Sequence, residues 1–239
     1  MESNRAVAVL PENKRLRLLS GVDVFETLPQ EELLSLARVC KPARYGAGRT
    51  IFEPETSTQE VFVLEEGQVR TYRTDPRARE VTLAILGQGT VFGRLGTGDQ
   101  AQGAYAQAVV SSVVSALGKE DLEHLVKRRP EVGLRLAGLV DERLSLSEDR
   151  ATELIQKEIP ARLASLLLRL VESEGVVTRE GYKIPTRYTH HQFGTMIGAN
   201  REAVTRAFTL LRRIGAVEVD DRLIRIPEPD VLRRAAGSP

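Results

Sequence analysis

The sequence contains one cysteine, Cys40, among its 239 residues. A single thiol cannot form a disulfide within the chain, and it cannot supply the several cysteines of an iron–sulfur cluster or a cysteine-rich zinc site. Histidine is almost as scarce, and none of the three histidines lies between residues 45 and 118. That stretch therefore has no obvious ligands for a haem or a cupin-type metal centre. We expect no metal site.

Long apolar runs are also missing. No stretch approaches the roughly 20 residues that span a bilayer, and the N-terminus lacks the basic, apolar and small-residue order of a signal peptide. We expect a cytoplasmic protein without a membrane partner.

The net charge of +1 hides an uneven distribution. Residues 157–239 contain 14 Lys and Arg against 10 Asp and Glu, a net charge of +4, whereas residues 1–156 contain 20 against 23, a net charge of −3. Binding a polyanion requires local rather than overall positive charge. The C-terminal third is therefore the better candidate for contact with nucleic acid.

Residues 45–118 predict an antiparallel β-sandwich or barrel, because short β-rich runs alternate with glycines and turn residues. The expected strands are 50–52, 60–64, 68–72, 81–85 and 105–117. Ahead of them the sequence predicts two short helices, the second of which is capped by Thr27. A short helix at 120–129 is expected to follow the β-region.

A long helix is expected at residues 130–156, and it carries two apolar stripes. The stripe expected to pack on the β-domain is Val132, Leu136, Leu139 and Leu146. The other stripe includes small residues that allow a partner helix to approach closely, and we interpret it as a symmetric dimer contact. Its members are Gly133, Ala137, Val140, Leu144, Ser147, Ala151 and Leu154, and the last six are the expected dimer-interface residues. The alternative is that both stripes face one monomeric core.

Residues 189–211 predict two short helices joined by a tight turn, a helix-turn-helix. Thr189 and Asn200 are good N-caps for the two helices, and Gly198 ends the first one. The expected buried stripes are Phe193, Ile197, Val204, Phe208 and Leu211. A helix at 161–173 after a hinge at Pro160, and two strands at 216–219 and 223–226, complete a winged helix.

The polar face of the second helix has side chains that match base edges in the DNA major groove. Arginine forks fit guanine, and a carboxylate can accept from cytosine. The expected base-reading residues are Arg201, Glu202, Thr205 and Arg206, and the expected phosphate contacts are Thr189, His190, Asn200, Arg212 and Arg213. The alternatives are an ordinary solvated face and, for His190 and His191, exposed or capping histidines.

The order of elements over roughly residues 22–226 resembles the cyclic-AMP receptor protein/fumarate-nitrate reduction regulator (CRP/FNR) family of bacterial transcription factors. The most specific part is Arg201-Glu202-x-Val204-x-Arg206 after Gly198-x-Asn200, and Gly67-x-Val69 and Gly89-x-Val91-Phe92-Gly93 agree with it. The resemblance implies a homodimer on a pseudo-palindromic DNA site. In the cyclic-AMP branch, the arginines and the glutamate at these positions read a TGTGA-type half-site.

The sensor half departs from the cyclic-AMP branch of this family. Arg94 stands where that branch has a glutamate, Gly103-Ala104 where it has an arginine–serine pair, and Ser147-Glu148 where it has paired hydroxyls. These departures argue against cyclic AMP as the effector. Another small molecule could occupy a pocket with Arg94, Tyr105, Ser147 and Glu148 in its lining, or the protein could act without an effector.

We therefore expect an α+β fold with an N-terminal antiparallel β-roll of the cyclic-nucleotide-binding (jelly-roll) type, a long dimerisation helix and a C-terminal winged helix-turn-helix. The expected domains are 1–156 and 157–239. The expected function is that of a sequence-specific DNA-binding regulator, with double-stranded DNA and a second copy as partners and with RNA polymerase as a partner of an activator. The alternatives are a cyclic-nucleotide-binding-like regulatory module or a cupin-type metalloenzyme.

Overall fold

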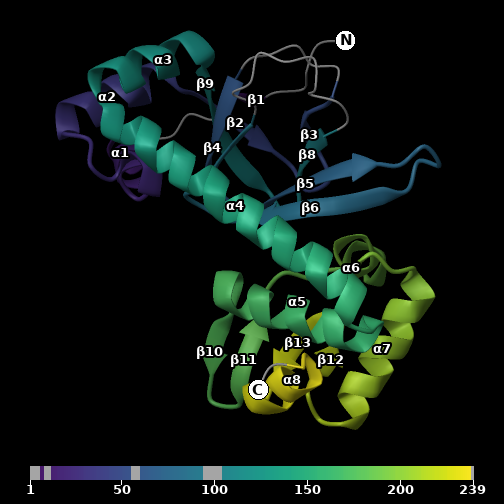
Figure 1. The fold of residues 1–239 in the computed structure, drawn as a ribbon. Helices are drawn as coiled ribbons and strands as arrows, with labels where there is room; N and C mark the ends of the chain where they lie inside the picture. Colours follow the sequence, from purple (N-terminus) through teal and green to yellow (C-terminus); the bar gives the residue numbers. More distant parts are fainter. Residues whose placement is uncertain (1–5, 8–11, 55–59, 94–103, 238–239) are drawn as a thin grey trace. The chain divides into compact units, whose positions relative to one another are not determined.

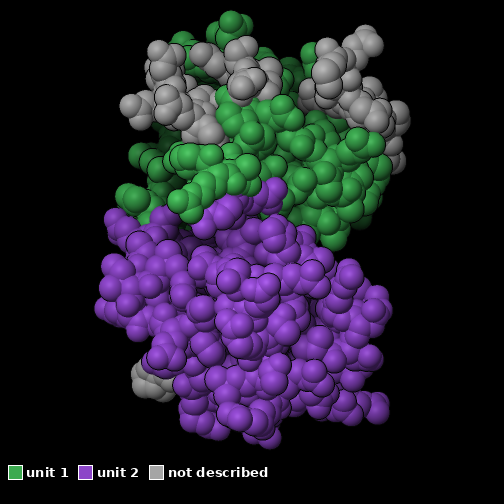
Figure 2. All heavy atoms as spheres, turned by 90° about the vertical axis from the view of Figure 1, so that its right-hand side faces the viewer, with its two compact units in different colours: residues 1–78, 83–144 green, residues 79–82, 145–239 purple. Residues whose placement is uncertain are grey.

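The computed structural model describes residues 6–7, 12–54, 60–93 and 104–237. The chain divides into two compact units, residues 1–78 with 83–144 and residues 79–82 with 145–239 (Figure 2). The division falls within the long helix, twelve residues before the domain boundary predicted at 156.

Two sheets form the N-terminal β-roll (Figure 1). One has the strand order β1-β2-β9-β4-β7, with strands Ala6–Val7, Lys41–Tyr45, Ser112–Gly118, Glu60–Glu66 and Val91–Gly93. The other has the order β3-β8-β5-β6, with strands Thr50–Phe52, Ala104–Ala108, Val69–Thr74 and Glu80–Leu86. The antiparallel roll is confirmed, but β1, β2 and β7 were not predicted, and the run predicted at 105–117 is two strands.

The sheet that contains β4 separates two hydrophobic clusters, because successive side chains of a strand point to opposite faces. Phe62 and Leu64 lie in the cluster between the two sheets. Val61 and Val63 lie in the cluster formed with the helices on the other face. The rings of Phe52, Phe62 and Phe92 contact one another, with centroids 5.5–6.3 Å apart, so aromatic rings fill the inside of the roll.

Helices cover the outer face of this sheet. They are α1 (Glu12–Ser20), the 3-10 turn η1 (Asp23–Phe25), α2 (Gln30–Val39) and α3 (Lys119–Arg128). The predicted cap of α2 is wrong: the N-cap is Pro29, no side chain caps the helix, and Thr27 is exposed in the preceding turn. Proline biases the residue before it away from helix, and buried Leu28 holds the chain there, so the helix begins only at Gln30.

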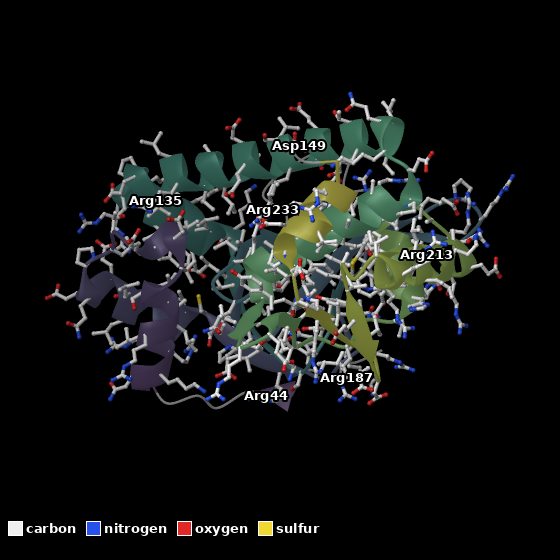
Figure 3. All side chains as sticks on the ribbon, turned by 90° about the horizontal axis from the view of Figure 1, so that it is seen from below. Arg44, Arg135, Asp149, Arg187, Arg213 and Arg233 are labelled. Carbon is white, nitrogen blue, oxygen red and sulfur yellow. The ribbon has the colours of Figure 1, made fainter. Side chains whose placement is uncertain are left out.

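Helix α4 (Pro130–Gln156) matches its predicted bounds. Its first stripe packs as predicted at Val132, Leu136 and Leu139, which join the cluster of the N-terminal helices. Leu146 is different, because 43% of it is exposed. On the same helix, Arg135 Nη1 lies 2.9 Å from Asp23 Oδ1 and 3.2 Å from Glu26 Oε2, which ties the first half of α4 to η1 (Figure 3).

The second unit is a winged helix with one sheet. Its helices are α5 (Ile159–Glu174), α6 (His190–Ile197), α7 (Arg201–Arg213) and α8 (Pro229–Ala235), and its sheet has the order β10-β11-β13-β12 with strands Val176–Thr178, Gly181–Ile184, Leu223–Ile226 and Glu218–Asp220. Helix α5 starts at Ile159, two residues before the predicted start at Ala161, and includes Pro160 in its first turn. Proline is tolerated there because the amide that it lacks would have no hydrogen-bond partner within the helix. Helix α8 was not predicted.

Candidate nucleic-acid interface

Both helices of the helix-turn-helix begin at the predicted caps. Thr189 Oγ1 accepts from the Gln192 amide at 3.1 Å, and Gln192 Oε1 accepts from the Thr189 amide at 2.7 Å, which completes a capping box. Asn200 Oδ1 accepts from the Ala203 amide at 2.8 Å. These three side chains therefore fix where α6 and α7 start.

The turn between the helices depends on glycine. Gly198 ends α6 with φ of 65° in the left-handed region, where a side chain is disfavoured. A Cβ atom on Gly198 would lie 3.1 Å from Leu154 Cδ2, so the end of α4 lies directly beside this turn. Arg162 of α5 donates from Nη1 to the Ile197 carbonyl at 2.8 Å and so holds the end of α6.

The predicted apolar stripes are buried. Phe193 and Phe208 meet edge to face with ring centroids 5.1 Å apart, and Tyr188 contacts Phe193 at 5.4 Å in the same manner. The five predicted stripe residues are all buried: Phe193, Ile197, Val204, Phe208 and Leu211. The two helices are thus locked together by aromatic packing, and α7 has a single face left for other contacts.

That remaining face of α7 is polar and exposed. The structure brings the four predicted base-reading residues together in the first two turns of the helix, and each is exposed: Arg201, Glu202, Thr205 and Arg206. Arg212 and Arg213 are exposed in the last turn, and Figure 3 labels Arg213. No described residue forms a salt bridge with Arg201 or Arg206 within 4.0 Å, so the guanidinium groups of the first turns are accessible to a ligand.

His190, predicted to contact phosphate, is half-buried and contacts α7. Its ring stacks on Phe208 at a centroid distance of 5.1 Å, and its Nδ1 lies 2.8 Å from Thr205 Oγ1. Burial, together with the nearby Arg201 guanidinium, lowers the pKa of His190 from its usual value of 6.5. Neutral imidazole is therefore the favoured form. His191, in contrast, is exposed.

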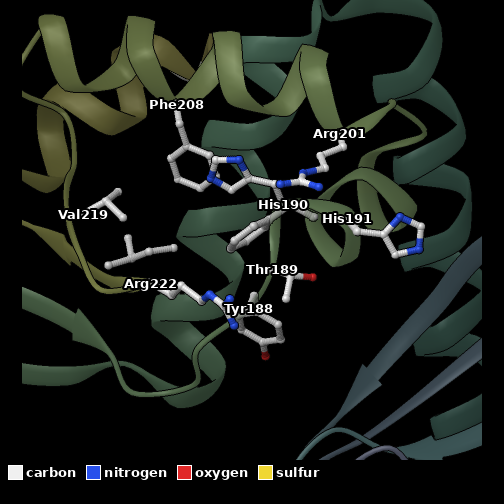
Figure 4. A pocket seen from close by; sticks show the side chains of 10 residues that line it. Tyr188, Thr189, His190, His191, Arg201, Phe208, Val219 and Arg222 are labelled. Atoms are coloured by element: carbon white, nitrogen blue, oxygen red, sulfur yellow. The ribbon is translucent and has the colours of Figure 1, made fainter.

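A cleft of about 460 Å³ lies between the start of α6, the start of α7 and the wing (Figure 4). Aromatic side chains and two arginines line it together with other residues: Tyr188, Thr189, His190, His191, Phe193, Arg201, Phe208, Val219, Arg222 and Ile224. Arg222 was not predicted. It lies in the two-residue turn between β12 and β13, where Asp221 and Arg222 have φ of 43° and 62°. The polar pair Asp221-Arg222 between two short β-rich runs could have indicated this hairpin turn from the sequence.

The residues predicted for an effector pocket are not brought together in one unit. Tyr105 stacks on Tyr72 at 4.9 Å, on the opposite face of β8 from core residues Ala106 and Ala108. Ser147 and Glu148 are exposed on the part of α4 that belongs to the second unit. Arg94 lies outside the described residues. The pocket therefore stays a prediction.

The second stripe of α4 is exposed from Ala137 onward, whereas Gly133 is half-buried. The exposed fractions of its three large side chains are 59% for Val140, 56% for Leu144 and 52% for Leu154. Its small members are exposed as well: Ala137, Ser147 and Ala151. Since neither unit buries this stripe, it is accessible to a partner.

Residues 6–7, 12–54, 60–93 and 104–237 contain neither a membrane-spanning helix nor a candidate metal site. In those residues no helix is long and apolar enough to cross a membrane. Three or more His, Cys, Asp or Glu side chains arranged to hold a metal ion are also not found among them.

Comparison with known proteins covers both units. Residues 42–129 match the cyclic nucleotide-binding domain, and residues 161–235 match the Crp-like helix-turn-helix domain. The chain is 29% identical over 219 residues to the cyclic AMP receptor protein of Thermus thermophilus, which covers 91% of this chain and 98% of that protein. It is 22% identical over 220 residues to the CRP-like cAMP-activated global transcriptional regulator of Mycobacterium tuberculosis, covering 92% and 98%.

The fold agrees with these matches. A solved structure of a CRP-family transcriptional regulator from Thermus thermophilus has a TM-score of 0.70 and 26% identity, and covers 82% of this chain and 96% of that one. The capped helix pair, the wing and the N-terminal roll occur in the order that this family requires, and the resemblance noted in the sequence is confirmed. The chain belongs to the CRP/FNR family of helix-turn-helix transcription regulators, which are DNA-binding proteins and not enzymes.

Proposed function

We propose that this regulator binds as a homodimer to a pseudo-palindromic DNA site with TGTGA-like half-sites. The observation that carries the proposal is the exposed polar face of α7, where Arg201, Glu202 and Arg206 stand on a helix fixed by a cap and an aromatic core. A recognition helix of this kind enters the major groove with its N-terminal residues at the base edges.

The chemistry of the three side chains assigns their roles. An arginine fork donates two hydrogen bonds to O6 and N7 of guanine, and the Glu202 carboxylate accepts from N4 of cytosine. Arg201 and Glu202 lie in the first turn of α7 and Arg206 follows in the next turn, which spreads the three groups along the groove. In a TGTGA half-site, the two guanines of one strand are the acceptors for the arginines, and the cytosine paired with one of these guanines is the donor for Glu202.

Groups around the helix-turn-helix position the complex on the sugar–phosphate backbone. Helix N-termini and cationic or hydroxyl side chains bind phosphate without reading sequence. We assign this role to Thr189, Asn200, Arg212 and Arg213, and we add Arg222 because it lies in the lining of the same cleft as Thr189. His190, predicted for the same role, instead contacts Thr205 through Nδ1.

The exposed stripe of α4 supports the dimer. The residues of this stripe recur every three or four positions and therefore lie along one side of the helix. The small residues among them allow close approach of a second α4. A symmetric pair of subunits would insert its two α7 helices into successive major grooves about 34 Å apart. The palindrome of the DNA site would then follow from the symmetry of the protein.

We infer that cyclic AMP is not the effector, although named relatives are described as cAMP-activated. The branch that binds it relies on a glutamate, an arginine–serine pair and paired hydroxyls, and this chain has Arg94, Gly103-Ala104 and Ser147-Glu148 in their place. We propose that another small molecule acts through this region, or that abundance alone controls the protein. Titration calorimetry with cyclic AMP tests this, and micromolar binding would contradict it.

A fluorescence-anisotropy titration with a labelled TGTGA palindrome tests the function. Arg201→Ala is expected to weaken specific binding by about 1–3 kcal/mol and to relax the preference at one base pair. Arg233→Ala is the matched control, because Arg233 is an exposed arginine of α8 that pairs with Asp230 outside the interface. Equal affinities of the wild type and Arg201→Ala for the palindrome would disprove the assigned role.

A further inference from the structure

The hydroxyl group of Thr205 is engaged on two sides within the protein. Its Oγ1 donates to the Arg201 carbonyl one turn earlier at 2.9 Å, and the same oxygen lies 2.8 Å from His190 Nδ1. Thr205 is nevertheless exposed on the polar face of α7 between Arg201 and Arg206. It therefore belongs to the surface proposed to meet DNA while its polar atom already has two protein partners.

The direction of these hydrogen bonds follows from the single proton that the Thr205 hydroxyl can donate. A carbonyl can only accept, so the single hydroxyl proton of Thr205 is directed to Arg201. The contact with His190 then requires a proton on Nδ1, because the hydroxyl oxygen can act there only as an acceptor. The neutral ring of His190 is thus fixed as the Nδ1–H tautomer.

The ring itself has little freedom. It stacks nearly parallel on Phe208, with an angle of 11° between the planes, and it is half-buried. A threonine in a helix has few χ1 rotamers, and bonding to the carbonyl four residues earlier selects between them. With Oγ1 held by Arg201 and His190, the methyl group is the part of Thr205 left for contact with a ligand.

We propose that His190 is a positioning residue for sequence recognition, which holds the Thr205 hydroxyl so that the Thr205 methyl group contacts the 5-methyl group of a thymine in the half-site. Threonine methyl groups form apolar contacts with thymine methyl groups in the major groove. This inference rests on the proposed function, because it requires α7 to lie in that groove.

Deoxyuridine scanning tests the contact, since deoxyuridine pairs as thymidine does but lacks the methyl group. Each thymine of a TGTGA palindrome is replaced in turn, and affinity is measured by anisotropy. One replacement is expected to weaken wild-type binding about fourfold, the effect of one buried methyl group. Thr205→Ser, which keeps the hydroxyl and loses the methyl, should abolish this sensitivity. Thr205→Val, which keeps the methyl and loses the hydroxyl, should retain it, because valine in a helix is held in one χ1 rotamer without the hydrogen bond from His190. The reverse pattern in these two variants would overturn the proposal.

A second pair of variants separates the hydrogen bond of His190 from its ring stacking. His190→Asn places an amide donor near the position of Nδ1, whereas His190→Phe keeps a ring on Phe208 but has no donor. We expect thymine discrimination to persist in His190→Asn and to be lost in His190→Phe, with both variants folded as judged by circular dichroism. Equal discrimination in both variants would refute the positioning role.

The tautomer can be measured without DNA. Long-range ¹H–¹⁵N correlation spectra of the free protein should show His190 as Nδ1–H, and an Nε2–H ring would overturn the proposal. Arg201→Ala distinguishes the two levels of inference. If it weakens binding while no deoxyuridine position matters, the thymine contact is wrong and the proposed function stands. If neither change affects binding, both are wrong.

Discussion

Removing the cation from a buried ion pair in the N-terminal unit should destabilise that unit strongly. Glu65 of β4 has a fully buried side chain, and Arg15 of α1 is 12% exposed, with Nη2 3.7 Å from Glu65 Oε1. Arg15 also donates to the Ala37 carbonyl and, at 3.0 Å, to the Cys40 carbonyl. Arg15→Met would leave a buried carboxylate and two carbonyls without these donors.

The expected loss is about 3 kcal/mol, the lower end of the range for breaking a buried pair, because Ser115 Oγ still donates to Glu65 Oε1. For a chain of this size, that corresponds to a fall of roughly 6–12 °C in the midpoint of thermal unfolding. Glu65→Gln removes the charge but keeps the acceptor, so the double variant Arg15→Met/Glu65→Gln should recover part of the loss. The coupling is obtained from a double-mutant cycle.

Cys40 provides an assay specific to this unit. Burial raises the pKa of its thiol to about 12, so a thiol reagent should react with it only after the N-terminal unit unfolds. In a urea titration, thiol labelling would then report the unfolding of the N-terminal unit, and circular dichroism would report the unfolding of the whole chain. Additive losses in the double variant, or a loss below about 1 kcal/mol for Arg15→Met, would refute the importance of the pair.

Three further predictions concern the second unit and α4. Gly198→Ala should lower the stability of the C-terminal unit by about 1–2 kcal/mol through left-handed strain and should weaken DNA binding. Gly215→Ala has comparable strain, with φ of 74° and open space around its Cβ, and should leave DNA binding closer to that of the wild type. The pKa of His190 is lowered in the folded protein, so the stability that the neutral ring contributes is present above pH 6.5 and should be lost as the pH falls through the folded pKa. Urea unfolding between about pH 7 and pH 5 should show this loss of stability, and His190→Asn should make the loss smaller. Leu144→Lys should convert the dimer to a monomer in light scattering, whereas Glu142→Lys, a charge change on another face of α4, should not; an unchanged dimer in Leu144→Lys would place the interface elsewhere.

The parts of the fold that the sequence predicts well are those set by local signals. Thr189 and Asn200 each cap a helix through a bond to an amide three residues ahead, so residue type and spacing were sufficient. The apolar steps of α7 likewise define its buried face without knowledge of its partners. The continuous apolar run at residues 61–64 likewise indicates a strand that is buried on both faces.

The parts that the sequence did not predict depend on distant partners. Strand β2 has the sequence Lys-Pro-Ala-Arg-Tyr, and it is a strand because β9 pairs with it and because Ala43 and Tyr45 are buried in the core between the two sheets. Propensity alone argues against a strand there. The contact between His190 and Thr205 joins residues 15 positions apart on two helices, and it exists only at the crossing angle that the aromatic packing imposes.

Selection from a random pool of duplex DNA tests the central claim most directly. The full chain should enrich an inverted repeat of TGTGA-like half-sites spaced by about one helical turn. The variant Arg201→Ala should enrich a motif degraded at one guanine, and Glu202→Ala a motif degraded at one cytosine. Enrichment of no common motif by the wild type, or of the same motif by all three proteins, would contradict the assignment of α7 as the helix that reads the site.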